Sequence, residues 1–364
     1  MTLEGKGFFL WKIKYCEGGD VEAIAERAVE AGFTHVLVKI ANGTGSYNIN
    51  PKTGEDLVGP LVKALRERDI AVWGWHYVYG YDPIGEADKA IQRVREHSLD
   101  GYVIDAEAEY KEAGRDRAAK QFMTRLRTGL PSFPVALSSY RFPSYHPQLP
   151  WNEFLAKCDL AMPQVYWEQS HNPAQQLTSC VNEYQTMPYI RPVVPTGSAY
   201  RRGSWAPTPE EMNEFMDTAL DLNLSAVNFW EWSHTRRYLL ELWHTVRDYD
   251  WESDEGVDIG NEYIEALNSH DPDRMVELYA ENAVHVNARH TIQGIEGIRE
   301  WYSELFTKLL PNGVYSLTNT LGTGRFRHIT WIAGSSAGHV DFGSDTISFS
   351  GGKISYHYTF FIVT

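Results

Sequence analysis

The stretch GYVIDAE (101–107) is a short apolar run that ends in two carboxylates. Similar apolar runs recur along the first 250 residues, and an amphipathic stretch separates each run from the next. Nearly continuous apolar strands that alternate with helices are typical of a parallel sheet buried on both faces. The expected strands are 8–13, 35–40, 71–79, 101–107, 135–140, 160–167, 191–197 and 225–232. The expected helices are 20–31, 55–68, 85–97, 113–129, 151–157, 172–187, 208–222 and 235–247.

Eight strand–helix units in succession predict an α/β fold over residues 1–250, closed into a (β/α)₈ TIM barrel. An open doubly wound sheet is the alternative, but no glycine-rich phosphate loop follows the first expected strand. Helix boundaries agree with the barrel. The segment TPEE (208–211) combines an N-cap residue, a first-turn proline and acids near the positive end of a helix.

Length and composition limit the function classes. A chain of 364 residues suits a barrel of about 250 residues with one smaller domain. The net charge of -15 argues against nucleic acid as the main partner, because binding phosphates requires basic patches. No apolar run approaches the roughly 20 residues of a membrane span, so no membrane partner is expected. The N-terminus lacks a signal-peptide core, which favours a soluble, cytoplasmic protein, or a secreted one if a leader was removed.

The cysteines give no indication of a metal site or a disulfide framework. Cys16, Cys158 and Cys180 are odd in number and widely spaced. We expect buried or incidental thiols.

The pattern changes near residue 250. The segment DYDWESDEGVD (248–258) is acidic and predicts a linker at 251–257. Beyond it, two helices interrupted at 269–272 and a third at 295–310 precede long segments that alternate with a period near two. With Gly351-Gly352 as a turn, these segments predict an antiparallel sheet in a smaller α+β domain over 258–364.

Asp105 and Glu107 are the first candidates for catalysis. They lie two residues apart at the end of the fourth expected strand, so both point to the same side, where functional side chains gather in a barrel. Burial and a neighbouring negative charge would keep Glu107 protonated, and it would donate that proton to a leaving oxygen. Asp105 would orient it or stabilise developing positive charge. The alternatives are a metal site, or an ion pair with Lys39 or an arginine.

Aromatic and polar side chains end the other expected strands. Because amphipathic rings pack well on the apolar faces of sugars, their convergence at one rim predicts a carbohydrate cleft. For any single ring, packing in the core is the alternative. For Glu231, an ion pair with Arg236 or Arg237 is an equal alternative. The expected substrate-binding residues are Trp11, Lys39, Trp75, Tyr77, Tyr140, Gln164, Trp230 and Glu231.

The strand DGYVIDAE (100–107) is similar to the pattern Asp-Gly-x-Asp-x-Asp-x-Glu of glycoside hydrolase family 18, which is chitinase-like. The resemblance implies Glu107 as the acid and Asp105 as its assisting aspartate. Val103 replaces the first aspartate of the triplet. The shorter Asp-x-Glu pair with flanking aromatics is equally similar to family 25, which is lysozyme-like and whose members cut peptidoglycan.

Two later segments extend the resemblance to family 18. The segment MPQVY (162–166) resembles the sixth strand, which implies that Tyr166 steadies an N-acetyl group. The segment FWEW (229–232) resembles the eighth strand, which implies Trp230 as the floor of the sugar site.

The resemblance implies a glycosidase that cleaves a β-linked, N-acetylhexosamine-containing glycan with retention. The acetamide oxygen of the substrate would attack, so neither a cofactor nor a metal is expected. One alternative is a catalytically inactive glycan-binding barrel, which Val103 favours. Another places activity or ligand binding in the C-terminal domain.

The C-terminal domain carries its own resemblance, on four segments: YIEALNSHD (263–271), LYAENAV (278–284), QGIEGI (293–298) and GKI (352–354). They resemble the SnoaL-like branch of the NTF2-like superfamily. This resemblance implies a cone-shaped domain with a curved sheet around a pocket, and a homodimer through that domain.

Four residues are candidates for the C-terminal pocket: His285, His339, Asp341 and His357. A His–Asp pair can act as a general base. A histidine in a strand is more often a hydrogen-bonded core residue, so ligand binding or dimerisation is expected ahead of catalysis.

Overall fold

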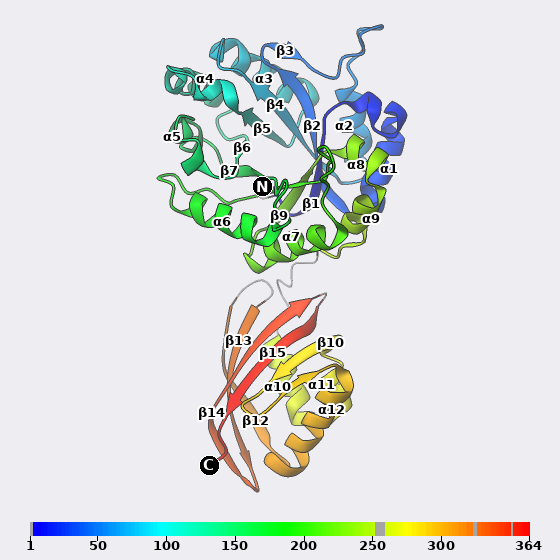
Figure 1. Cartoon of the computed structure of the whole chain (residues 1–364), viewed down its shortest axis with the longest axis vertical. Coiled ribbons are helices and arrows are strands. Elements are labelled where there is room, and N and C mark those ends of the chain that lie inside the picture. The colour runs from blue at the N-terminus through cyan, green and yellow to red at the C-terminus, as the bar shows by residue number, and fades with distance from the viewer. Residues whose placement is uncertain (1–2, 252–258, 323–325, 351) are drawn as a thin grey trace. The chain divides into compact units, whose positions relative to one another are not determined.

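The computed structural model describes residues 3–251, 259–322, 326–350 and 352–364 (Figure 1). The chain divides into two compact units, Met1–Trp251 and Glu252–Thr364. Residues 252–257 of the expected linker and Gly351 of the expected turn lie outside the described residues. Among the described helices, none combines the length and apolar character that a membrane crossing demands.

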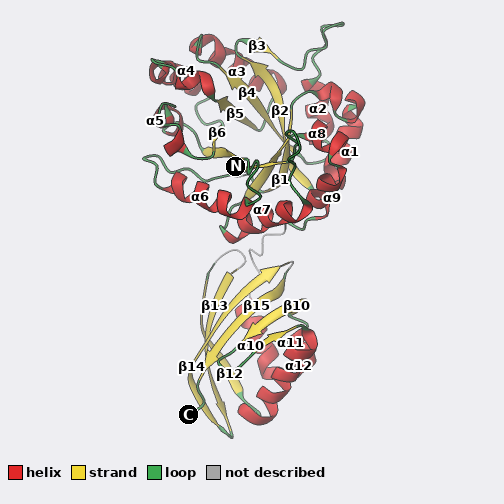
Figure 2. Ribbon diagram, viewed as in Figure 1, coloured by secondary structure: helices red, strands yellow, loops and turns green. Residues whose placement is uncertain are grey.

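Eight parallel strands close the first unit into a barrel, with helices around its outside (Figures 1 and 2). The ring closes because β1 (Gly5–Leu10) pairs with both β2 (Phe33–Asn42) and β9 (Ala226–Trp230). A short antiparallel strand, β3 (Gly45–Ser46), extends from β2. The predicted (β/α)₈ barrel is confirmed. The remaining barrel strands are β4 (Ala71–Val78), β5 (Gly101–Ala106), β6 (Val135–Tyr140), β7 (Leu160–Val165) and β8 (Thr196–Ser198).

The helices follow the strands in the expected order. Thr208 caps α7 through a capping box with Glu211, as its sequence predicts. The helix expected at 235–247 is instead two helices, because Leu239 leaves the helical conformation and packs into the core. The helices are α1 (Val21–Glu30), α2 (Val58–Arg66), α3 (Pro83–His97), α4 (Arg115–Gly129), α5 (Trp151–Leu155), α6 (Pro173–Gln185), α7 (Pro209–Asp221), α8 (Trp232–Tyr238) and α9 (Leu240–Asp248). Short 3₁₀ turns occupy Ile13–Tyr15, Glu17–Gly19, Ala108–Lys111 and Pro143–Tyr145.

The period of two along β5 decides which side chains enter the barrel. Tyr102 and Ile104 pack outward in the core beneath the helices. Val103 belongs to a separate apolar cluster inside the barrel, with Trp73, Trp75 and Met162 among its members. Asp105 has the same parity as Val103 and therefore lies inside the barrel, one step nearer the C-terminal end of the strand.

The second unit packs helices against a six-stranded sheet of order β11-β10-β15-β14-β13-β12 (Figure 2). The expectation of a purely antiparallel sheet is wrong, because β10 runs parallel to β15. These strands come from opposite ends of the unit, so no hairpin forces them to be antiparallel. The helices are α10 (Ile259–Ser269), α11 (Pro272–Val276) and α12 (Ile295–Glu304), which continues as a π-helical turn, Leu305–Leu309. The strands are β10 (Tyr279–Val286), β11 (Thr291–Gln293), β12 (Val314–Leu321), β13 (Phe326–Ser335), β14 (Gly338–Ser350) and β15 (Lys353–Phe361).

Candidate active site

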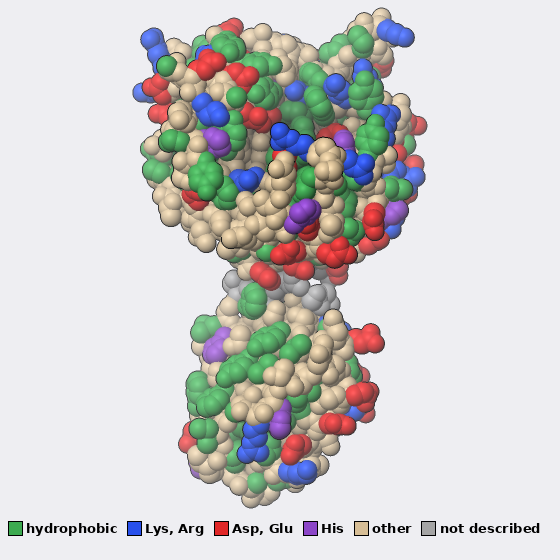
Figure 3. All heavy atoms as spheres, viewed as in Figure 1, with side chains coloured by type: hydrophobic (Ala, Val, Ile, Leu, Met, Phe, Trp, Pro, Cys, Tyr) green, Lys and Arg blue, Asp and Glu red, His purple; other side chains and the backbone are tan. Residues whose placement is uncertain are grey.

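A cavity of about 380 Å³ lies at the C-terminal ends of the barrel strands. It is large enough for a small molecule or a sugar unit. In the view of Figure 3, the first unit is hollowed near its centre, with acidic and basic side chains beside the hollow. The lining residues are Trp11, Lys39, Trp75, Tyr77, Asp105, Glu107, Gln164, Tyr166, Glu168, Tyr200 and Trp230.

A carboxyl pair occupies the inner end of this cavity. Asp105 is buried, whereas Glu107, just past the end of β5, is partly exposed. The side-chain amide of Gln164 donates to Glu107 Oε1 at 2.8 Å and to Asp105 Oδ1 at 3.2 Å. Burial, and next the negative charge of Glu107, raises the pKa of Asp105 well above its usual range. Asp105 therefore keeps its proton to a higher pH than an exposed aspartate does.

Lys39 is a buried cation held among aromatic rings. Its Nζ lies 4.5 Å from the ring centre of Trp75 and 4.6 Å from that of Tyr47. No ion pair joins Lys39 to Asp105, Glu107 or any other carboxylate of the described chain, so the structural ion-pair alternative does not apply to it. Burial lowers the pKa of Lys39 to about 8, against the opposing effect of the Asp105 charge. The amine can therefore change its charge near neutral pH.

Two tyrosines supply hydroxyl groups to the cavity wall. Tyr77 donates its hydroxyl to Glu109 Oε2 at 2.7 Å. Tyr166 is edge-on to Tyr200, with ring centres 5.4 Å apart. Burial, and next the proximity of Tyr200, raises the pKa of Tyr166 well above its usual range. Tyr166 thus stays protonated and remains a hydrogen-bond donor.

Tryptophan rings form the apolar part of the cavity. Trp230 lies edge-on to Trp75, with ring centres 5.3 Å apart, and packs near Trp11 at 6.2 Å. Trp75 is fixed because its Nε1 donates to the Leu10 carbonyl at 3.1 Å. Trp11 is exposed at the rim. The rings give a rigid apolar surface with one open edge.

Glu168 and Tyr200 line the cavity although the sequence analysis did not select them. The Tyr200 hydroxyl and the Arg202 guanidinium both bind the carboxylate of Glu168. The positions of both residues in the sequence could have indicated that they belong to the site. Glu168 lies two residues after Tyr166, and Tyr200 lies two residues past the end of β8, where strand-end residues of a barrel collect.

Tyr140 and Glu231 lie outside this cavity. Tyr140 lines a neighbouring cavity of about 270 Å³. Glu231 lines neither of them, and its carboxylate accepts from the backbone nitrogens of Ser233 and His234 and caps α8. The expectation of Glu231 as a substrate-binding residue is therefore corrected, and the alternative ion pair is also wrong for Arg236, which pairs with Glu17.

In the second unit, the four candidate residues form two separate pairs, and only one of these pairs is buried. His285 and His357 are fully buried, with ring centres 4.6 Å apart. The acid beside them is Asp345, whose Oδ1 lies 3.3 Å from His357 Nε2. His339 and Asp341 instead pair with each other at 3.5 Å on an exposed part of β14.

The buried cluster of the second unit is only partly hydrogen-bonded. Trp331 Nε1 donates to Asp345 Oδ2 at 2.6 Å, and Tyr279 shares a hydrogen bond with His357 Nδ1. Both ring nitrogens of His285 lack a hydrogen-bond partner. Burial, and next the charge of His357, lowers the pKa of His285 to about 2. His285 is therefore a neutral ring at physiological pH.

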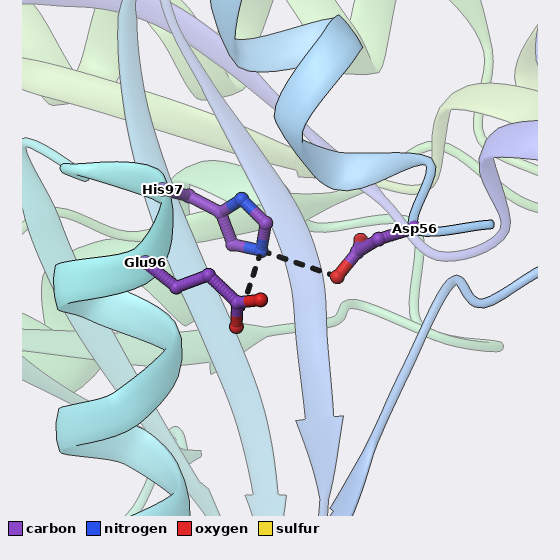
Figure 4. A group of neighbouring side chains, drawn as sticks. All are labelled: Asp56, Glu96 and His97. Carbon is purple, nitrogen blue, oxygen red and sulfur yellow. Dashed lines mark ion pairs between the residues drawn. The ribbon is translucent and has the colours of Figure 1, made fainter.

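Asp56, Glu96 and His97 also bring ligand atoms close enough for a metal ion (Figure 4). His97 Nε2 lies 3.4 Å from Asp56 Oδ2 and 3.9 Å from Glu96 Oε2. The guanidinium of Arg93 already binds both carboxylates, at 3.1 Å from Asp56 Oδ1 and 3.1 Å from Glu96 Oε2. A cation would have to displace this arginine, so the group is an ion-pair network, and it lies outside the cavity described above.

Residues 261–362 match the SnoaL-like domain family, so the second unit is a SnoaL-like domain, as expected. A solved protein of the SnoaL-like family from Agrobacterium tumefaciens str. C58 is 26% identical, over 29% of this chain and 94% of that chain, with a TM-score of 0.26. An NTF2-like protein of unknown function from Cytophaga hutchinsonii ATCC 33406 is 15% identical, over 29% and 88%, with a TM-score of 0.25. No curated protein is significantly similar in sequence to the chain.

Proposed function

We propose that the barrel is a glycoside hydrolase that cleaves a β-linked, N-acetylhexosamine-containing glycan. The observation that carries the proposal is the Asp105–Glu107 pair, bridged by Gln164 at the inner end of an aromatic-lined cavity. A buried carboxyl with a raised pKa beside a partly exposed one can store a proton and deliver it.

In this proposal, Glu107 is the general acid. It receives a proton from Asp105 and gives it to the glycosidic oxygen as the bond to the anomeric carbon breaks. The acetamide oxygen of the same sugar then bonds to the anomeric carbon, and Asp105, now ionised, stabilises the positive charge on the acetamide group. Water next attacks the anomeric carbon, the bond from that carbon to the acetamide oxygen breaks, Glu107 takes a proton from the water, and the product retains its configuration.

The cavity wall would position the sugar for these steps. Trp230 offers an apolar face for the ring that carries the scissile bond, and Trp11 extends this surface to the rim. Tyr166 stays protonated and can donate to the acetamide group. Gln164 keeps both carboxyl groups in place throughout.

The test is hydrolysis of chitin oligosaccharides and of peptidoglycan by the full chain. The Glu107→Gln variant should lower kcat by about 10³-fold, because a general acid typically contributes 10² to 10⁴. Glu112→Gln is the matched control, since Glu112 is an exposed acid paired with Arg115 a few residues along the chain. Equal turnover by the wild type and Glu107→Gln excludes Glu107 as the acid.

A glycan-binding barrel without catalysis is the second candidate. Val103 favours it, because a buried valine stands inside the barrel next to Asp105 where the family 18 pattern has an acid. Calorimetric binding of the same oligosaccharides with no product after prolonged incubation would select this candidate.

The buried cluster of the SnoaL-like domain supports a third candidate, ligand binding or catalysis within that unit. His357 and Asp345 form a His–Asp pair, and His285 beside them has two unpartnered nitrogens. If a glycan or another ligand binds the full chain equally well in Glu107→Gln but is lost in His285→Phe, this domain holds the site.

A further inference from the structure

A second cavity adjoins the central cavity of the barrel. The cavity of about 380 Å³ and its neighbour of about 270 Å³ share Gln164, Tyr166 and Glu168 in their walls. The neighbour, called the side cavity below, is also lined by Tyr140, Arg141, Phe142, Tyr145, His146 and Arg202. A chain of sugars that crosses the carboxyl pair would therefore place a further residue in the side cavity.

A third cavity, of about 310 Å³, lies beside the central one at the ends of β1 and β2. Tyr47 lines it, and the Tyr47 ring lies 4.6 Å from Lys39 Nζ, which lines the central cavity. Lys12 and Lys14 also line this third cavity, and Lys12 Nζ lies 4.6 Å from the ring centre of Trp11 at the central rim. The three cavities thus lie next to one another, with the carboxyl pair in the central one, and together they are called the cleft below.

The charges along this cleft alternate in sign. Asp105 and Glu107 occupy the centre, and the one carboxylate among the described residues that line the side cavity, Glu168, is paired there with Arg202. At the two ends, the basic side chains Arg141, Lys12 and Lys14 form no ion pair with any carboxylate that the structure describes. In a protein with a net charge of -15, unpaired basic groups gathered on both ends of one cleft indicate a ligand that carries negative charge.

Arg141 is the most constrained of these cations. Its Nη1 donates to the Tyr166 carbonyl, and the guanidinium lies 5.2 Å from the ring centre of Phe142. Its Nη2 makes no hydrogen bond to the described residues, and Arg141 lines the side cavity. A planar guanidinium matches a carboxylate best.

A further cation lies beside the same cavity. Lys111 Nζ is 4.7 Å from the ring centre of Tyr140, whose other neighbour, the ring of His146, stacks on it at 3.7 Å. Burial, and next the charge of Lys111, lowers the pKa of His146. His146 is therefore neutral there, and Arg141 and Lys111 supply the positive charge.

We propose that the glycan taken by this cleft is acidic, with a carboxylate-bearing sugar bound to Arg141 in the side cavity and a second carboxylate near Lys12 and Lys14. The inference rests on the proposed glycosidase function and adds the substrate class. A neutral glycan such as chitin would leave these basic groups without an opposite charge.

The test measures binding in the Glu107→Gln variant, so that cleavage does not affect the result. Calorimetry compares oligosaccharides of alternating glucuronic acid and N-acetylglucosamine with their carboxyl-reduced forms. Soluble peptidoglycan glycan strands and their carboxyl-reduced forms provide the second arm, which distinguishes a uronic acid from a lactyl ether as the source of the carboxylate. We expect at least one acidic glycan to bind about tenfold or more tightly than its reduced form.

Adding Arg141→Gln should remove most of this preference and leave the affinity for the reduced form within about twofold. Arg237→Gln is the matched control, because Arg237 is exposed on α8 beside Tyr238 and lines none of the three cavities. Since Arg141 also holds the Tyr166 carbonyl, Lys14→Gln gives an independent variant that should weaken binding of the acidic form alone.

Equal affinity for acidic and reduced forms of both glycans overturns the inference, as does tighter binding of chitin oligomers. An unchanged preference in Arg141→Gln overturns the assignment of that residue. Cleavage of neutral chitin without any acidic preference leaves the glycosidase proposal intact and removes this inference. A strong acidic preference with no hydrolysis by the wild type supports this inference and removes the glycosidase proposal.

Discussion

Asp105 in the barrel and Asp345 in the SnoaL-like domain are both buried carboxyl groups with titratable neighbours, yet their surroundings differ. Asp105 lies beside Glu107, which is partly exposed and lines a cavity. Asp345 is fully buried, and its neighbours His357 and His285 are fully buried as well. A proton on the first pair can reach a ligand in the cavity, whereas a proton on the second cluster has no exposed carrier among these three residues.

A group with a shifted pKa is a candidate for chemistry only when one member of its cluster lines an accessible cavity. His285 has a strongly lowered pKa, but it is fully buried, and so is its neighbour His357. Asp105 has a strongly raised pKa and a partner that opens into the cleft. A shifted pKa inside a sealed cluster changes the stability of the fold, whereas a shifted pKa beside a cavity can change the rate of a reaction.

The largest expected effect separates the two aspartates. Asp105→Asn should lower kcat for glycan hydrolysis by about 10² to 10³, because position 105 can no longer pass a proton to Glu107. Asp345→Asn should leave kcat unchanged, because the acid lies in the other unit. Reducing-end assays on both variants measure this difference, with circular dichroism to confirm folding. A similar loss of kcat in Asp345→Asn would show that the two units do not act separately.

The next effect concerns acid stability of the SnoaL-like domain. His285 has a pKa of about 2 when folded and about 6.5 when unfolded, so the unfolded chain binds the proton first. The stability that neutral His285 contributes is present above pH 6.5 and is lost as pH falls toward 2. The loss between pH 7 and pH 4 should be about 3 kcal/mol.

His285→Phe tests this acid sensitivity. Phenylalanine keeps a ring beside Trp301 and cannot take up a proton, so the free energy of unfolding should fall less between pH 7 and pH 4 than in the wild type. Urea unfolding at the two pH values measures it. His339→Phe, at an exposed position, should behave as the wild type. An equal loss in the wild type and His285→Phe would contradict the assignment.

The barrel could be predicted from sequence because its signal is local and repeats along the chain. Each apolar run and each amphipathic stretch indicates its own element, and eight repeats limit the topology. The seventh strand is shorter than the predicted 191–197: β8 covers Thr196–Ser198, and before it an isolated bridge joins Val193 to Ala161. Pro192 and Pro195 lack the N–H donors of a paired strand, so the regular ladder starts after them.

Two features of the candidate sites could not be predicted from sequence: which face of a strand a residue occupies after a bulge, and which carboxylate caps a helix. The pairing of β13 with β14 shifts between Trp331 and Ala333, and the buried positions on β14 change from Val340 to Gly343 and Asp345. This bulge turns His339 and Asp341 outward, although a strict period of two gives them the same parity as Asp345. Glu231 was lost from the site for another reason, since a free helix N-terminus follows it and its carboxylate caps that helix.

A smaller effect is expected from Lys39, which influences the pKa of Asp105 in the carboxyl pair. The positive charge of Lys39 lowers the pKa of Asp105, against the larger effects of burial and Glu107. Activity should fall as pH rises through the raised pKa of Asp105, because the proton on Asp105 is then lost. Lys39→Met should move this alkaline limb upward by roughly one pH unit.

The pH profile of kcat/KM measures this shift. Lys63→Met is the control, because Lys63 is an exposed residue on α2 that pairs with Glu67. If Lys39 itself set the alkaline limb, through its own pKa of about 8, Lys39→Met would abolish the limb instead of moving it.

The smallest effect is expected for the exposed pair of the SnoaL-like domain. His339 and Asp341 are 3.5 Å apart, with side chains 60% and 81% exposed, so water screens their interaction. Replacing both with alanine should change the free energy of unfolding by less than about 0.5 kcal/mol at pH 7. Urea unfolding of the double variant beside the wild type measures the change. Only a desolvated pair can lower the free energy of unfolding by more than about 2 kcal/mol when it is removed. A loss of that size would mean that His339 and Asp341 belong to the buried cluster and not to an exposed strand.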